Sequence, residues 1–252
     1  MQAPEERPFV VPCARLSLDA PWRWLRLGWQ DFTRAPRLSL IFGVVIMLVS
    51  VAVSALAWSL GRFALLATLL SGFVFVAPLI AVGLYCVSRE LGAGRTPSLR
   101  QSLVLARRVA GQAGIFALAQ LVILLVWSRA GMMLSAFFPV DANDASLLFE
   151  YLAYGSAIGT VFAALTFATA AVSLPMIADR DVDMITACIS SINAVLRNKP
   201  TMLLWAFLIA VLTAAGFVTA FVGLVVIMPW LAYATWHAYR ETLQSGDWPV
   251  LD

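Results

Sequence analysis

Charged side chains are scarce in this sequence. Only 12% of its 252 residues are charged, 62% are hydrophobic, and the mean hydropathy is +0.88. A soluble domain has about 25% charged residues and about half apolar ones, and it needs a polar surface in water. The composition therefore predicts a membrane protein whose apolar surface faces lipid.

Histidine is almost absent, since His237 is the only one. A single histidine excludes a bis-histidine haem site or a multi-histidine copper or zinc site within one chain, and we expect no cofactor. His237 stands beside Trp236 and near Tyr239 at the end of an apolar run. An interfacial position among these aromatic rings is the favoured interpretation. A lone proton acceptor, or a ligand shared with a partner, is the alternative.

Cysteine is also rare. Cys13, Cys86 and Cys188 are an odd number and lie far apart in the sequence, which argues against a disulfide framework. They are interpreted as small buried hydrophobic residues. The sequence has no phosphate loop, dinucleotide fingerprint, zinc-protease helix or paired cysteine motif. We therefore expect no enzymatic activity and no metal site.

Acidic residues are missing from the interior of every predicted span, which argues against a proton-coupled carrier. Arg129 is the single basic residue that could dip inward, at a cost of about 3 kcal/mol at mid-bilayer, so we expect it to reach the outer headgroups instead. Gln120 is one of several uncharged polar residues inside the spans. These residues either line a cavity or form hydrogen bonds between helices.

Three similar segments are present, and each closes a pair of hydrophobic runs. They are residues 78–89, 173–180 and 228–240. In each one an apolar helix contains a proline and ends at an arginine; the prolines are Pro78, Pro175 and Pro229. This pattern predicts a threefold internal repeat in which the prolines kink the helices.

The repeat predicts six transmembrane helices of about 20 residues each. Their expected positions are about 39–60, 63–88, 109–128 and 151–174, with two more inside 201–239. A turn at Gly216 or Gly223 would separate the last two, and a single long kinked helix is the alternative. The stripe formed by Gly155, Gly159 and Ala163 predicts close packing of another helix, from this chain or from a partner.

An amphipathic helix is predicted before each pair of spans, at about 21–34, 98–108 and 179–200. In the first helix, Trp22, Leu25, Trp29 and Phe32 share one face and arginines share another. Aromatic residues and arginines at this spacing are typical of a helix in the membrane interface. Whether the three helices contact lipid or cap the bundle is open.

The predicted organisation is a disordered tail at 1–18, one six-span domain at 19–243 and a second tail at 244–252. The repeat units are about 19–89, 95–180 and 181–240. Among the 17 arginine and lysine residues, only Arg62 and Arg129 fall on the side of the short loops. The positive-inside rule therefore places both termini in the cytosol. Because the other basic residues flank the spans, no nucleic-acid partner is expected.

Four segments together resemble a bacterial family of integral membrane proteins, the domain of unknown function 2189. They are residues 21–32, 78–89, 175–180 and 234–240, and the resemblance covers about residues 20–243. It implies a polytopic inner-membrane protein. Some members of the family carry the label of a cytochrome c oxidase subunit. A catalytic subunit would need haem and copper ligands, so a chain with one histidine fits only an accessory or assembly role.

The leading hypothesis is a non-enzymatic scaffold or accessory subunit of the bacterial inner membrane. Its expected partners are the lipid bilayer and another membrane protein or a second copy of the chain. The alternative is a transporter or channel for a neutral or hydrophobic solute, because transporters often contain internal repeats. A haem- or copper-associated subunit is the weakest of the three hypotheses.

Overall fold

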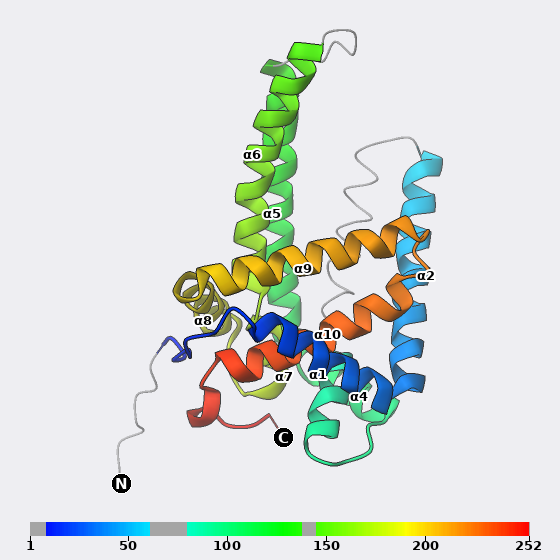
Figure 1. Ribbon diagram of the computed structural model, residues 1–252, viewed down its shortest axis with the longest axis vertical. Helices are drawn as coiled ribbons and strands as arrows, with labels where there is room; N and C mark the ends of the chain where they lie inside the picture. The colour runs from blue at the N-terminus through cyan, green and yellow to red at the C-terminus, as the bar shows by residue number, and fades with distance from the viewer. Residues whose placement is uncertain (1–8, 61–79, 138–144, 252) are drawn as a thin grey trace.

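The regular structure of the chain is helical (Figure 1). The computed structural model describes residues 9–60, 80–137 and 145–251. Within these ranges the strand-like pairing consists of two isolated antiparallel bridges, Cys13–Leu243 and Arg180–Val250. The all-α class predicted from the sequence is confirmed. Most of the predicted second span, including Pro78, lies outside the described residues.

The first two helices, α1 (Ala20–Arg34) and α2 (Pro36–Leu60), are separated by one residue, Ala35. Pro36 begins α2 because the N–H that proline lacks would have no helical acceptor in the first turn. The break expected at Pro36 therefore separates the amphipathic helix from the first apolar one. Helix α2 contains residues 36–55, which are long and apolar enough to cross a membrane.

The middle of the chain follows the predicted alternation of polar and apolar helices. After a helical stretch at 80–92 come α4 (Leu99–Arg108), α5 (Ala110–Phe137), α6 (Ala145–Ala170), α7 (Ser173–Asp179) and α8 (Met184–Arg197). Helix α4 begins at a capping box in which Ser98 and Gln101 bond each other's backbone N–H groups. Helix α8 begins where the Asp183 side chain accepts the Thr186 N–H at 2.9 Å.

Two helices, α9 (Lys199–Val218) and α10 (Leu224–Thr242), occupy the apolar stretch 201–239. The alternative of one long kinked helix is therefore wrong. The turn between them uses two residues with positive φ, Ala220 at 51° and Phe221 at 69°. Gly223 stands at the N-cap of α10. The turn thus lies between the two glycines that were expected to supply it.

Four of the described helical segments have the length and apolarity of a membrane span. They are residues 36–55, 110–134, 149–179 and 199–218. Figure 1 shows α2, α5 and α6 running along the long axis of the molecule, whereas α9 and α10 run across it. The third helical pair therefore does not repeat the direction of the second.

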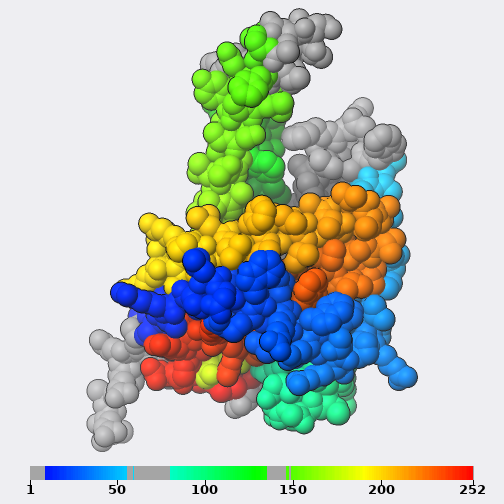
Figure 2. All heavy atoms as spheres, viewed as in Figure 1, coloured from blue at the N-terminus to red at the C-terminus, as the bar shows by residue number. Residues whose placement is uncertain are grey.

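The long pair α5–α6 forms an arm that extends beyond the rest of the protein (Figures 1 and 2). The described terminal segments, 9–18 and 244–251, lie away from the far end of the arm (Figure 1). Helices α1, α4 and α7 also lie towards the end opposite the arm. The polar helices α1 and α4 therefore lie on the same side of the molecule.

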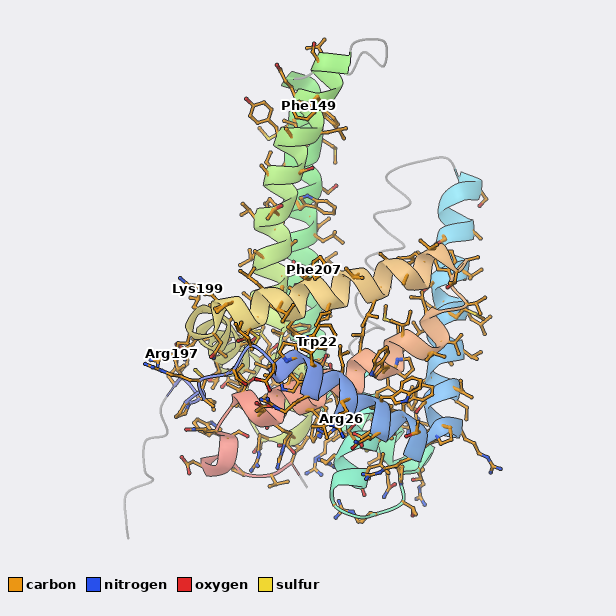
Figure 3. All side chains as sticks on the ribbon, in the orientation of Figure 1. Trp22, Arg26, Phe149, Arg197, Lys199 and Phe207 are labelled. Atoms are coloured by element: carbon orange, nitrogen blue, oxygen red, sulfur yellow. The ribbon has the colours of Figure 1, made fainter. Side chains whose placement is uncertain are left out.

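The face of α1 that was predicted to lie in the membrane interface is divided in the structure. Leu25 and Phe32 are buried in the protein, whereas Trp22 is 57% exposed and Trp29 is 44% exposed. Trp24, with no exposed surface, and Asp31, 4% exposed, are buried in their place. Helix α1 packs mainly on α10, so its inner face is set by that partner. Figure 3 shows Trp22 and Arg26 along the outer side of α1.

Both predicted tails contain residues that are held against the helices. The Val11 N–H donates to Ser190 Oγ at 2.9 Å, and the Leu16 N–H donates to Asn198 Oδ1 at 2.8 Å. At the other end, the Leu251 N–H donates to the Asp179 carbonyl at 3.0 Å. The segments 9–18 and 244–251 thus cover the end of the protein that holds the termini.

Candidate functional site

Helix α10 is the element against which the rest of the protein is organised, because each of the three apolar clusters includes its residues. Ala234 and Ala238 pack with Trp24 and Trp205 from α1 and α9. Tyr233 packs with residues of α1, α2 and the 80–92 helix. On the remaining side, Trp236 and Tyr239 join the largest cluster. Two buried carboxylates also bind side chains of this helix.

The first carboxylate is Asp31 of α1, which is 4% exposed. Its Oδ2 atom accepts the Ser88 hydroxyl at 2.7 Å and lies 2.8 Å from His237 Nε2. Three segments of the chain, α1, the 80–92 helix and α10, therefore meet at one oxygen atom. Hydrogen bonding compensates the cost of burying this polar group.

The Asp31 cluster contains serine, aspartate and histidine, but its geometry is not that of a nucleophilic triad. In a triad the serine bonds to the histidine, which in turn bonds to the carboxylate. Here Ser88 and His237 both bond to Oδ2 of Asp31. The cluster can hold the three helices together, but the serine and the histidine are not bonded to each other as a triad requires.

Sequence reasoning missed Asp31. It is the only acidic residue in α1, and it follows Trp24 and Gly28 at helical spacing on the buried face. The available signal in the sequence was an acidic residue on an otherwise apolar face of a predicted helix. His237 was interpreted as an interfacial residue, and the structure adds that its Nε2 atom is bonded to this buried carboxylate.

The second carboxylate, Asp179, follows the fourth predicted span and is also 4% exposed. Its Oδ2 atom accepts the Tyr239 hydroxyl at 2.7 Å and lies 3.1 Å from Arg180 Nε and 3.5 Å from Arg240 Nη1. Arg89 Nη1 donates to the neighbouring Ala178 carbonyl at 3.4 Å. The arginines that end the three repeated segments thus converge around the end of α7.

Two of the repeated segments align without a gap from the proline to the arginine. Pro78 and Pro229 each stand eleven positions before an arginine, and each arginine is followed by a glutamate, Glu90 or Glu241. Tyr85 and Trp236 occupy equivalent positions, and their rings are stacked with centroids 6.3 Å apart. The structure therefore places the ends of these two segments side by side.

Both of these glutamates are paired, each with a different partner. Glu90 accepts Arg95 Nε at 2.7 Å and Arg95 Nη2 at 2.9 Å. Glu241 accepts the Trp24 indole N–H at 2.8 Å and is also paired with Arg23. The hydrogen bonds from Arg95 hold the pKa of Glu90 below its usual value. These pairs fix the ends of the two segments to the adjacent polar elements.

The predicted proline kinks fall in different settings. Pro229 is buried inside α10. Pro175 lies in the first turn of α7, after a break at residues 171–172 that separates α7 from α6. A proline inside a helix leaves one backbone carbonyl without its helical N–H donor. Pro229 is in this position, whereas Pro175 stands in a first turn, where the N–H would have no helical acceptor.

The predicted polar residues of α5 also differ in their surroundings. Gln120 Nε2 donates to Thr169 Oγ1 of α6 at 3.0 Å, which is the interhelical hydrogen bond rather than the cavity lining. Arg129 is exposed near the far half of α5. None of the ion pairs among the described residues includes Arg129.

The small-residue stripe of α6 faces side chains of α5. A Cβ atom added at Gly155 would lie 3.5 Å from Leu134 Cδ2, and one added at Gly159 would lie 3.8 Å from Trp127 Nε1. These are ordinary contacts, so among the described helices no backbone approaches closely there. Ala163 continues the same helix.

Close backbone approach occurs instead at Gly28 and Gly43, which sequence reasoning did not select. A Cβ atom on Gly28 would lie 2.6 Å from the Ala234 nitrogen, and one on Gly43 would lie 2.7 Å from the Val225 carbonyl carbon. Helices α1 and α2 therefore both cross α10 at a glycine.

The residues present do not fit a haem–copper centre. The only histidine is already bonded through Nε2 to Asp31. Across residues 9–60, 80–137 and 145–251, no group of three His, Cys, Asp or Glu side chains is placed to hold a metal ion.

The long apolar helices and the helical fold define an integral membrane protein. More particularly, residues 65–179, a little under half of the chain, match the family described as "Predicted integral membrane protein (DUF2189)". This is the family that the sequence resembles, and the resemblance is confirmed over those residues. The matched segment contains Pro78, Glu90 and Asp179. We found no match among curated proteins or among solved structures.

Proposed function

We propose that this protein is a non-enzymatic membrane scaffold or accessory subunit that binds a transmembrane helix of another protein along its α5–α6 arm. The observation that carries the proposal is the isolation of the arm. Among the described elements, α5 and α6 pack on each other and, at the base of the arm, on α4, α7, α8 and the 80–92 helix. Figure 2 shows the outer part of the arm extending beyond the other described elements.

The surface of the arm is apolar over most of its length. Val122 and Val126 of α5 are each 53% exposed, and Val161 of α6 is 66% exposed. Phe149, near the far end of the arm in Figure 3, is 74% exposed. Added Cβ atoms at Gly114 and Gly131 of α5 would meet no atom of the described residues within 4 Å. Small residues with open space above them allow the backbone of a second helix to approach closely.

The polar clusters support a structural role rather than catalysis. Asp31, Glu90 and Asp179 each bind at least two donors from other segments of the chain. Such networks fix the relative positions of helices when their polar groups are satisfied. The protein therefore presents a rigid body from which the arm projects.

Site-specific photocrosslinking in the native membrane tests this proposal. A photoreactive residue at Val126 or Val161 should form a reproducible adduct with one protein, which mass spectrometry then identifies as a partner or as a second copy. Leu48 of α2, which is 57% exposed, is the matched control. Adducts with lipid alone at Val126 and Val161 would overturn the proposal, as would protein adducts of equal yield at Leu48.

A transporter or channel for a neutral or hydrophobic solute is the second candidate. It is supported by the matched segments around Pro78 and Pro229 and by the proline inside α10, because transporters often combine internal repeats with interrupted helices. Solute-dependent flux through the purified protein in liposomes would favour this function over the scaffold.

We also propose that the chain lies in the bacterial inner membrane with both termini in the cytosol. The positive-inside rule supports this orientation, because only Arg62 and Arg129 of the 17 arginine and lysine residues fall on the side of the short loops. Cysteine labelling of intact cells provides the test. A cysteine introduced in the segment 245–247 should be protected from an impermeant reagent until the membrane is opened.

A further inference from the structure

A pocket of about 540 Å³ lies between the start of α5, the α7–α8 connection and the C-terminal segment. Its charged and amide-bearing lining residues are Arg108, Gln112, Arg180 and Asp181. Its apolar lining includes Val109, Ile177, Val182, Val250 and Leu251. The pocket is distinct from the Asp31 cluster and lies at the base of the α5–α6 arm.

Hydrogen bonds hold the walls of this pocket in place. Arg180 Nη1 donates to the Trp248 carbonyl at 2.8 Å, and its Nε atom lies 3.1 Å from Asp179 Oδ2. The Asp181 N–H donates to the Pro249 carbonyl at 3.0 Å. Gln112 Oε1 accepts the Met184 N–H at 3.0 Å, which ties α5 to the start of α8. The Arg180 guanidinium is therefore oriented before any ligand binds.

Arg108 supplies a second guanidinium from the end of α4. It is exposed, and no ion pair among the described residues includes it. Arginine presents a planar set of N–H donors that matches the oxygens of a phosphate group. A pocket lined by one oriented and one unpaired arginine is suited to a phosphate.

The position of the pocket indicates where that phosphate comes from. Val109 and Gln112 flank the start of the candidate span at residues 110–134, so the pocket lies at the depth of the lipid headgroups if α5 crosses the membrane. Basic pockets beside transmembrane helices are known sites for anionic headgroups. The apolar lining suits the adjoining glycerol and acyl carbons.

Asp181 adds a specificity element. A carboxylate in the pocket repels a second negative charge but accepts a hydrogen bond from a hydroxyl or ammonium group. Headgroups such as glycerol or ethanolamine carry such donors, whereas the quaternary ammonium of choline has no N–H or O–H.

We infer that this pocket binds a phosphodiester headgroup, with its phosphate between Arg108 and Arg180 and a donor of the headgroup on Asp181. Free phosphate in solution offers the same phosphate oxygens as the lipid headgroup. The inference does not depend on the partner of the arm, and it assigns the pocket a ligand whether the chain acts as a scaffold or as a transporter.

Native mass spectrometry of the purified full chain tests it, with phosphatidylglycerol, phosphatidylethanolamine or phosphatidylcholine added separately. We expect tighter binding of the first two lipids than of phosphatidylcholine. Arg108→Gln should weaken their binding by about tenfold or more, because a charge-assisted hydrogen bond contributes on the order of a factor of ten in affinity. The matched control is Arg107→Gln, since Arg107 is an exposed neighbour on the same helix and does not line the pocket.

Asp181→Ala tests the specificity element separately. It should remove the preference for phosphatidylethanolamine over phosphatidylcholine while binding of the phosphate remains. If inorganic phosphate displaces the lipid at equal occupancy, the ligand is a soluble phosphate and not a lipid, and the phosphate-binding site is still supported. Equal binding by Arg108→Gln and Arg107→Gln, or equal binding of all three lipids by the unmodified chain, would overturn the inference. The binding results expected here do not depend on the photocrosslinks at Val126 and Val161. The failure of one proposal can therefore be distinguished from the failure of the other.

Discussion

The crossing of α1 over α10 at Gly28 gives the sharpest test of the fold. In Gly28→Ala the new Cβ atom would lie 2.6 Å from the Ala234 nitrogen, 2.9 Å from the Trp230 oxygen and 3.0 Å from the Ala234 Cα atom. All three are backbone atoms, so no side-chain rotation relieves the contact. Ordinary contact begins at 3.4 Å, and α1 must therefore move away from α10 by about 0.8 Å.

That displacement loosens the interface that buries Trp24, Leu25 and Phe32. Overpacking of this kind costs typically about 1–3 kcal/mol, and the higher helix propensity of alanine returns up to about 1 kcal/mol. Gly114→Ala has the same gain in propensity, so Gly28→Ala should be less stable than Gly114→Ala by about 1–3 kcal/mol. For a chain of this length, that corresponds to a difference of roughly 2–12 °C in the midpoint of thermal unfolding.

The assay is thermal unfolding in detergent, followed by tryptophan fluorescence. Gly114→Ala is the control, because an added Cβ atom there would meet no atom of the described residues within 4 Å. It keeps only the gain in helix propensity, so its unfolding midpoint should be unchanged or higher. If Gly28→Ala unfolds at the same temperature as Gly114→Ala, the close crossing of α1 and α10 is refuted.

Three further predictions concern the polar contacts. Asp31→Ala leaves Ser88 and His237 without their shared acceptor and should lower the free energy of unfolding by about 2–3 kcal/mol. Ser88→Ala removes only one donor and should lower it by about 1 kcal/mol. Chemical denaturation measures both losses, and equal losses would contradict the shared acceptor. The lowered pKa of Glu90 means that its ion pair contributes fully above the ordinary carboxyl pKa of 4.5 and is lost as the pH falls through the lowered value. Glu90→Gln should therefore show a smaller fall in unfolding temperature below pH 4.5 than the unmodified chain, and an identical pH profile would count against the pair. Gln120→Leu removes one interhelical hydrogen bond and should cost about 0.6 kcal/mol or less; complete loss of the folded protein would show that Gln120 has another role.

Sequence reasoning predicted the class and most helix boundaries because those features depend on local properties. An apolar run long enough to span a membrane is visible in composition alone. Ser98 and Asp183 are capping residues whose bonds reach only three positions along the chain. The break between α1 and α2 follows from proline chemistry at Pro36.

The candidate site was predicted only in part, because its bonds connect distant positions. Asp31 and His237 are 206 residues apart, and nothing local to Asp31 indicates an acceptor for two donors. The small-residue stripe at Gly155 was visible in the sequence. The closer crossing at Gly28 was not, because a single glycine carries no periodic pattern.

By itself, the sequence determined an all-helical membrane protein with paired apolar helices, basic amphipathic segments and repeated proline–arginine segments. Tertiary structure decided which face of α1 is buried: Trp22 and Trp24 are both apolar aromatic residues, and only the packing against α10 distinguishes them. It also decided that α9 and α10 run across the molecule while α5 and α6 run along it. Hydropathy determines that a helix avoids water, whereas its direction depends on the helices it packs against.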